Sequence, residues 1–258
     1  MKGKFHTNSI IISVLVVYFI IFTVHTVHGA PTDFPIPNID ISVDNASTPQ
    51  QYVGNIKLLI MLTILTLLPS IIMMMTSFVR IVVVFGFLRT AMGTQQSPPN
   101  QVLVGLALFL TVFIMLPVYG KINSEAIQPY LQNGITQEQA VERGAKPLRE
   151  FMLKQTRQKD LKLFVDEAKL NYEVTKDNAP LYVVIPAYII SELKTAFQIG
   201  FLLYIPFMII DLVVGSVLMS MGMFMLPPVM ISLPFKLLLF VMTDGWYLLV
   251  KSLIISFS

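Results

Sequence analysis

The sequence contains no cysteine, and its only histidines are His6, His25 and His28. Without cysteine, the chain forms no disulfide, thiol nucleophile or cysteine metal site. All three histidines lie within the first 30 residues, which we predict to be largely an export signal. If that signal is removed, the remaining chain has neither residue type, which excludes a zinc site of the usual kind and a histidine-based catalytic triad. No cofactor or metal is expected.

Charged residues are also scarce. They make up 13% of the 258 residues, and hydrophobic residues make up 55%, whereas roughly a quarter of the residues in a soluble domain are charged. This composition predicts a membrane protein. The net charge is only +3 and the basic residues do not form a run, so nucleic acid is not an expected partner.

The N-terminus has the pattern of a secretory signal peptide, which we assign to residues 1–29. Lys2 and Lys4 precede an apolar run at 10–22, and small residues then provide a cleavage site after Gly29. The alternative is an uncleaved first membrane helix. We favour the signal peptide because the apolar run is short for a span, which needs about 20 residues.

Residues 30–55 are rich in proline and polar residues without an apolar period, which predicts an exported linker. Residues 56–119 form a first apolar helical block, whose run at 56–92 is too long for one span. Pro69 predicts a bend in this run, and Arg80 is expected to face protein or water. The rest of the block contains a turn and a second span, at 93–100 and 102–118.

Residues 120–180 are the only long polar region and hold 10 of the 18 basic and 9 of the 15 acidic residues. They predict a small, nearly neutral, helical soluble domain. Thr136 and Gln139 have the spacing of a capping box. Gly144 is expected to end the helix that the box begins, and Pro147 to open the next one.

Residues 181–258 form a second apolar block, with a long helix at about 187–222 and a last helical segment at about 231–256. Pro227 and Pro228 predict the break between them. We therefore predict an all-α, multi-pass membrane protein with helical hairpins.

Two arguments about the side of the membrane on which residues 120–180 lie conflict with each other. A cleaved signal leaves the new N-terminus outside, and counting spans then places this region outside as well. The positive-inside rule would place its basic residues in the cytoplasm, but the rule weakens for loops of about 60 residues. We therefore predict an extracytoplasmic domain.

Five charges interrupt the apolar blocks, and each costs at least about 2.5 kcal/mol at mid-bilayer unless it is paired or hydrated. Asp211 and Lys236 lie on opposite arms of the predicted hairpin, about 16 and 8 residues from its prolines. Simple antiparallel packing would leave them two turns apart, so pairing needs a bend or another chain. Alternatively, each meets a different polar group. The five charges are Arg80, Glu192, Lys194, Asp211 and Lys236.

Methionine is abundant, at 15 residues, and one cluster lies directly before the proline pair. Methionine often fills irregular apolar space, and that is the ordinary explanation. The alternative is that flexible thioethers from several subunits crowd a lumen and yield when something passes. The cluster comprises Met219, Met221, Met223 and Met225.

Three long stretches resemble the FliP family, whose members are flagellar biosynthetic proteins of the type III export gate. The resemblance extends from about residue 56 to the end of the chain. The stretches are MMMTSFVRIVVVFGFLRTAMGTQQSPPNQVLVGLALFL, IPAYIISELKTAFQIGF and MGMFMLPPVMISLPFKLLLFVMTDGW.

The resemblance implies a non-enzymatic subunit in the bacterial inner membrane, at the flagellar basal body. It implies several copies, five in number, in a helical ring with FliQ and FliR, and with FlhB and FlhA nearby. This ring would form the entry channel for unfolded flagellar subunits. The family also buries much of its apolar sequence between subunits, above the bilayer.

The resemblance also implies roles for particular residues. Met223, Phe224 and Met225 match a gasket that closes the pore, although the family more often has methionine at the central position. Asp211 and Lys236 match positions that pair within the assembled gate. Residues that match inter-subunit or pore contacts are Phe151, Arg157, Phe164 and Glu192.

Three other functions compete with this one. A virulence-type injectisome subunit would share the gate chemistry but typically lacks a cleavable signal. A small-solute transporter would be expected to show inverted repeats, and no repeat stands out. A membrane hydrolase could use Ser191 with Lys194, but the neighbouring Glu192 argues against a lone, desolvated base.

Overall fold

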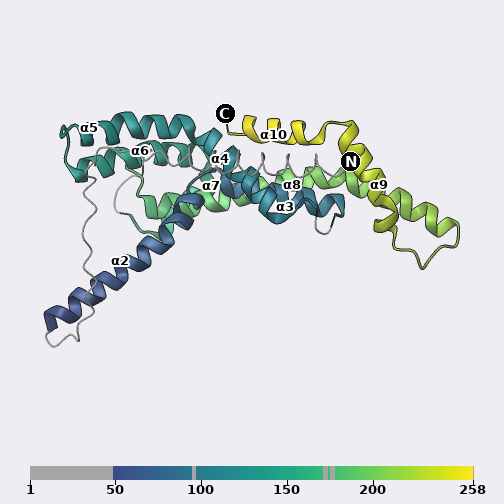
Figure 1. The fold of residues 1–258 in the computed structure, drawn as a ribbon, viewed down its shortest axis with the longest axis horizontal. Coiled ribbons are helices and arrows are strands. Elements are labelled where there is room, and N and C mark those ends of the chain that lie inside the picture. Colours follow the sequence, from purple (N-terminus) through teal and green to yellow (C-terminus); the bar gives the residue numbers. More distant parts are fainter. Residues whose placement is uncertain (1–48, 95–96, 171–173, 175–177, 258) are drawn as a thin grey trace, which may run out of the picture. The chain divides into compact units, whose positions relative to one another are not determined.

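The computed structural model describes residues 49–257, apart from 95–96, 171–173 and 175–177. The predicted signal peptide and most of the predicted linker lie outside the described residues. Within the described ranges every regular element is a helix (Figure 1), which confirms the all-α prediction. In chain order the elements are α2 (Pro49–Met74), α3 (Phe78–Met92), α4 (Asn100–Ile122), the π-helical segment η1 (Asn123–Ile127), α5 (Gln128–Leu131), α6 (Gln137–Gln155), α7 (Gln158–Glu167), α8 (Leu181–Ser220), α9 (Pro228–Met242) and α10 (Gly245–Ile255).

Three of these segments are long and apolar enough to span a membrane: Val53–Met74, Asn100–Leu131 and Leu181–Ser220. Helices α9 and α10 provide a fourth candidate if the pair counts as one broken span, since they are bent by 62° at their junction. These segments confirm the prediction of a multi-pass membrane protein.

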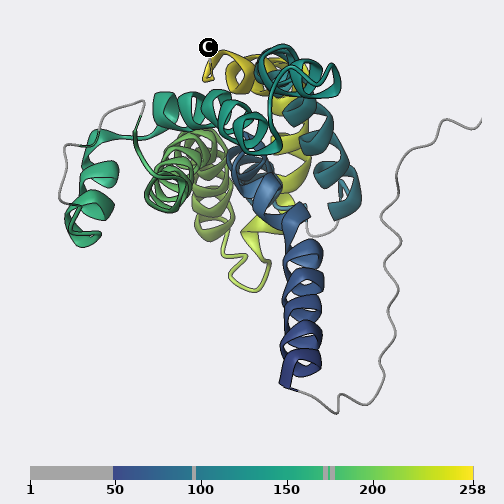
Figure 2. The same ribbon diagram turned by 90° about the vertical axis from the view of Figure 1, so that its left-hand side faces the viewer.

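Residues 57–258 form one compact unit, and its core is built around α3. Helix α3 packs along α8, as both ribbon views show (Figures 1 and 2). The buried side chains of α3 include Ile81, Val84 and Phe85, and they meet side chains from α4, α8, α9 and α10. The long apolar runs are thus packed partly against one another within a single chain.

Helices α3 and α8 approach closely at Gly200. A β-carbon at this position would lie 2.4 Å from the Phe87 ring and 2.9 Å from the Phe87 β-carbon. The Phe87 ring also packs edge-on against Phe197, with the ring centroids 4.9 Å apart. Gly200 therefore allows the aromatic side chain of α3 to lie against the α8 backbone.

The break in the first apolar block differs from the prediction. Helix α2 continues through Pro69 and ends at Met74, so the expected bend at the proline is not where the helix is interrupted. The interruption comes at residues 75–77, where the Tyr188 hydroxyl of α8 donates a 2.8 Å hydrogen bond to the Thr76 carbonyl. A tertiary contact thus satisfies a backbone group that the helix end leaves free.

The polar region confirms one local prediction and corrects another. Thr136 and Gln139 form a complete capping box at the start of α6. The prediction that Gly144 ends this helix and Pro147 begins another was wrong, because α6 runs through both to Gln155. A β-carbon at Gly144 would lie 3.5 Å from that of Ala126, so this glycine lies where α6 packs closely against η1.

The C-terminal block is more divided than expected. Helix α8 begins at Leu181 and ends at Ser220, and the last segment splits into α9 and α10. At the corner, Asp244 has φ +50°, and a β-carbon on Gly245 would lie 2.3 Å from the Phe240 ring. The bulky ring therefore requires glycine at the first residue of α10.

Candidate functional site

The predicted gasket residues lie in the loop between α8 and α9. Gly222 has φ +77°, and the Met223 N–H donates to the Leu218 carbonyl at 3.0 Å, so the chain turns sharply as α8 ends. Met223, Phe224 and Met225 are 39%, 78% and 97% exposed. Met221 and Leu226 of the same loop are also exposed, at 67% and 40%, so the loop presents five large apolar side chains at the hairpin tip.

On the two helices that this loop connects, Asp211 of α8 and Lys236 of α9 lie together within one chain. The Lys236 ammonium lies 2.6 Å from the Asp211 carboxylate. Asp211 lies nine residues before the end of α8 at Ser220, and Lys236 lies eight residues after the start of α9 at Pro228. The expected offset of two turns does not arise because residues 221–227 are not helical, so neither a bend nor a second chain is needed.

Two further groups hold this ion pair. The Lys236 ammonium donates to the Ala91 carbonyl at 3.1 Å, near the C-terminus of α3, where the helix dipole favours a cation. The Ser232 hydroxyl donates to the other Asp211 oxygen. Neither Ser232 nor Ala91 is distinguished by any pattern in the sequence. The pair therefore joins α3, α8 and α9, and not only the two arms of the hairpin.

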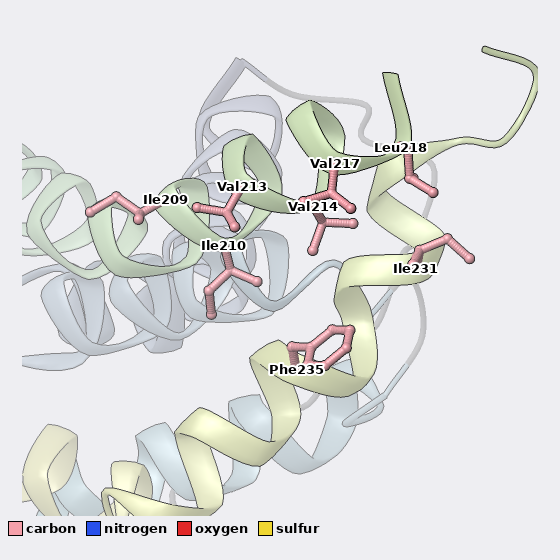
Figure 3. A pocket seen from close by; sticks show the side chains of 8 residues that line it. All are labelled: Ile209, Ile210, Val213, Val214, Val217, Leu218, Ile231 and Phe235. Carbon is pink, nitrogen blue, oxygen red and sulfur yellow. The ribbon is translucent and has the colours of Figure 1, made fainter. Parts of the chain in front are cut away.

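An apolar groove lies between α8 and α9, the two helices that the Asp211–Lys236 pair connects (Figure 3). Its volume is about 510 Å³. The labelled side chains come from α8, at Ile209–Leu218, and from α9, at Ile231 and Phe235. The groove therefore offers apolar contact and no polar side chain.

A second buried charge pair joins Arg80 to Glu192. The Arg80 Nε lies 2.9 Å from Glu192 Oε2, and Arg80 Nη2 pairs with the other carboxylate oxygen, so the contact is bidentate. Both side chains are buried. Glu192, matched by resemblance to an inter-subunit or pore position, instead has its carboxylate directed at α3 of its own chain.

The remaining N–H groups of the Arg80 guanidinium donate hydrogen bonds to Ser256 near the C-terminus and to Gln155. Nη1 donates to the Ser256 carbonyl and to the Ser256 hydroxyl, each at 2.9 Å, and Nη2 donates to Gln155 Oε1 at 3.1 Å. The guanidinium also lies 3.8 Å from the centre of the Phe257 ring, a favourable cation–π distance. Arg80 thus links α3, α6, α8 and the chain end.

Arg157 belongs to a third cluster, which joins α7 to α8. Its guanidinium lies 2.5 Å from the Asp160 carboxylate. The same carboxylate accepts a 2.6 Å hydrogen bond from Ser191, whose oxygen accepts one from the Arg157 N–H at 3.1 Å. Burial raises the pKa of Asp160, but the hydrogen bonds from Ser191 and Arg157 outweigh it and lower the pKa overall.

This cluster also bears on the hydrolase alternative. Ser191 is buried, and its hydroxyl is engaged with Asp160 instead of facing an open cleft with Lys194. A serine in this state is not accessible as a nucleophile. Within the described ranges, no group of three or more His, Cys, Asp or Glu side chains is arranged to hold a metal ion.

The two predicted aromatic contacts occupy different surroundings. Phe151 is half-buried on α6, with its ring stacked on Phe257 at 6.3 Å and tilted against Tyr188 at 6.1 Å. Phe164 is half-buried on α7. Phe151 and Glu192 therefore adjoin the same Arg80 cluster, and Arg157 is linked to it through Ser191, the neighbour of Glu192 in the sequence.

Comparison with known proteins gives the family. The model of the FliP family matches residues 61–253. The flagellar biosynthetic protein FliP of Bacillus subtilis (strain 168) is 56% identical over 217 residues, which cover 84% of this chain and 98% of that protein. The proteins of the same name from Pectobacterium carotovorum and Aquifex aeolicus are 55% and 53% identical, and the matches cover 81% and 86% of this chain and 81% and 92% of those proteins. With matches of this extent along nearly whole relatives, the chain belongs to the FliP family.

Proposed function

We propose that this protein is a channel-forming subunit of the flagellar type III protein export gate. In this role it passes unfolded flagellar subunits across the bacterial inner membrane, at the flagellar basal body. The observation that carries the proposal is the identity of more than half over nearly the full length of flagellar biosynthetic proteins. Neither the injectisome nor the transporter alternative has comparable support.

The exposed apolar surface of the chain supports a role within an assembly. The loop residues Met223, Phe224 and Met225 project from the hairpin tip, and one loop is too small to surround a channel. Five copies would place their loops around a common axis and close the channel along it. FliQ and FliR would complete the ring, with FlhB and FlhA next to it.

The internal charge pairs support a structural role without catalysis. The charges of two buried pairs are neutralised within the chain: Arg80 with Glu192, and Lys236 with Asp211. Each pair joins helices that are far apart in the sequence, so the pairs would give each subunit a fixed shape before it enters the ring. Four residues would then affect contacts with neighbouring subunits mainly by positioning the helices that carry them: Phe151, Arg157, Phe164 and Glu192.

The test is to delete the gene in its own bacterium and to restore it on a plasmid. Loss of swimming and of flagellin export, both restored by the plasmid copy, would support the proposal. In parallel, the chain is purified in mild detergent with its candidate partners, and the masses of the intact complex and of the mature chain are measured. Two results together would overturn the proposal: the purified chain stays monomeric in the presence of those partners, and cells that lack the gene still swim.

A further inference from the structure

Three methionines alternate with other residues in the loop between α8 and α9: Met221, Met223 and Met225. All three are exposed, and Met225 almost completely. Met92 and Met152 are instead buried among core side chains. The sulfur of a methionine side chain is oxidised to a sulfoxide where small oxidants reach it. The loop therefore offers thioethers that are open to reaction, whereas the core protects its own.

The exposure of this loop follows from a defined turn. The Gly222 N–H donates to the Met219 carbonyl at 3.1 Å. The Met223 N–H donates to the Leu218 carbonyl at 3.0 Å. Together with φ +77° at Gly222, these hydrogen bonds make a Schellman motif, in which a glycine ends the helix. The next helix begins at Pro228, so the thioethers between project from a fixed turn and not from a frayed helix end.

No polar side chain lies in the loop. Residues 221–228 comprise only methionine, glycine, phenylalanine, leucine and proline, and the prolines also lack an N–H group. A sulfoxide oxygen is a hydrogen-bond acceptor, so oxidation would place a polar atom where the loop supplies no side-chain donor. A buried polar group without a partner is unfavourable, whereas water satisfies it. Oxidation therefore favours states of the loop in which water reaches the side chains.

We propose that Met223 and Met225 form a reversible oxidation site that loosens the seal of the export channel. The inference rests on the proposed function, because it requires loops from several copies to pack together around a channel. In the closed channel the two thioethers flank Phe224 near the axis, where a small peroxide reaches them from the water in the lumen. Their sulfoxides then bring hydration into an apolar seal.

The reaction transfers one oxygen atom from hydrogen peroxide to sulfur. The sulfur lone pair attacks one peroxide oxygen, so that an S–O bond forms and the O–O bond breaks. The proton of the transferred oxygen passes to the departing hydroxide, which leaves as water. Sulfur is thus oxidised by two electrons and the peroxide is reduced. Methionine sulfoxide reductases reverse the change with a thiol as reductant, one enzyme for each sulfoxide epimer.

The first test maps the oxidation in the complex of the full chain with its partners, purified in mild detergent. The complex is treated with hydrogen peroxide, and the sulfoxides are located by mass spectrometry of its peptides. We expect sulfoxide at Met223 and Met225 while Met92 and Met152 remain unmodified. This measurement uses the unmodified chain, so it does not depend on whether a variant assembles. Oxidation of Met152 as early as that of Met225 would overturn the proposal.

The second test measures the conductance of the complex in planar bilayers before and after peroxide. One sulfoxide left without a hydrogen bond in the closed state should raise the open fraction about tenfold, and treatment with both reductases should reverse the rise. The double variant Met223→Leu with Met225→Leu keeps the apolar volume but carries no sulfur, so peroxide should leave its conductance unchanged. Met208→Leu, on α8 outside the loop, is the matched control and should respond to peroxide as the unmodified chain does.

Two outcomes would overturn this inference and leave the export role intact. In the first, peroxide raises the conductance of the leucine double variant as much as that of the unmodified complex. In the second, Met223 and Met225 are fully oxidised and the conductance stays low, although replacing both and Phe224 by glycine opens the channel. If the glycine replacement also leaves the conductance unchanged, the loop forms no seal, and its proposed role in the channel fails together with this inference.

Discussion

Arg80 and Glu192 form a bidentate ion pair between α3 and α8, 112 residues apart in the sequence and almost inaccessible to solvent. The other donors of the same guanidinium hold Gln155 and the Ser256 carbonyl. A buried charge pair of this kind is costly to break, because removal of one partner leaves the other buried and uncompensated. The integrity of the helical core therefore depends on both residues.

Arg80→Gln is expected to destabilise the chain by about 3–5 kcal/mol, the usual effect of leaving a buried charge unpaired. Thermal unfolding of the detergent-purified protein measures this effect. The double variant Arg80→Met with Glu192→Leu removes both charges and should recover much of the loss. Arg89→Gln, on the same helix but only partly buried, is the control. A single variant as stable as this control would contradict the prediction.

For the second pair, Asp211→Ala and Lys236→Ala are each expected to prevent recovery of the assembled complex and to abolish swimming. Exchanging the two residues is expected to restore little. In the exchanged chain the carboxylate at position 236 would face the Ala91 carbonyl, which now accepts a hydrogen bond from Lys236, so two acceptors would meet.

Ser232→Ala provides a graded comparison for the same junction. It removes one hydrogen bond to Asp211 but leaves the ion pair, so it should reduce complex yield less than either single charge variant. Full swimming in both charge variants, or full rescue by the exchange, would show that the geometry around Ala91 is unimportant.

Gly200→Ala is expected to destabilise the packing of α3 on α8 by about 1–3 kcal/mol, the usual cost of overpacking. The added methyl would lie 2.9 Å from the Phe87 β-carbon, so rotation of the ring does not relieve the clash. Gly105→Ala on α4 has no atom within 4 Å of the new methyl. This control should be neutral or slightly stabilising, since alanine favours helix over glycine. Thermal unfolding in detergent compares the two, and equal midpoints would contradict the prediction.

Features that depend on nearby residues were predictable from the sequence. The capping box at Thr136 and Gln139 forms as its spacing predicts, and the prolines at 227 and 228 lie at the break between α8 and α9. Helix boundaries set by tertiary contacts were not. At the break after α2 the Thr76 carbonyl is bonded by Tyr188, 112 residues away, and Gly144 lies inside α6, where it packs against Ala126, instead of at a helix end.

The buried charges show the same distinction. The free-energy cost of an unpaired charge in an apolar block indicated from the sequence that Arg80, Glu192, Asp211 and Lys236 need partners. Which partners they have depends on which helices pack together, and the sequence does not give that. The offset expected for Asp211 and Lys236 was counted from the prolines, whereas α8 ends at Ser220, seven residues before Pro227. Donors such as Ser232 carry no pattern in the sequence that distinguishes them from other serines.

In the assembled complex, replacing Met223, Phe224 and Met225 together by glycine is expected to make the membrane leak ions. These three are among the large exposed side chains at the hairpin tip, and glycine removes the apolar volume that would close the channel. Conductance of the complex in planar bilayers measures the leak. Phe224→Met keeps comparable apolar bulk and should stay closed. An unchanged conductance in the triple variant would count against a seal at this loop.

Acid is expected to release α7 from α8. The pKa of Asp160 is lowered in the folded chain, so its stabilising contribution is fully present above the ordinary carboxyl pKa near 3.9 and is lost as the pH falls through the folded value. Protection of the α7 amides, measured as the exchange rate relative to that of an unfolded peptide at the same pH, should therefore decrease below about pH 4. In Asp160→Asn, exchange at α7 should be faster already at neutral pH and should lose most of this acid dependence. Asp166→Asn, exposed on the same helix, should behave as the unmodified chain. If Asp160→Asn keeps the full acid response, another group controls the docking of α7.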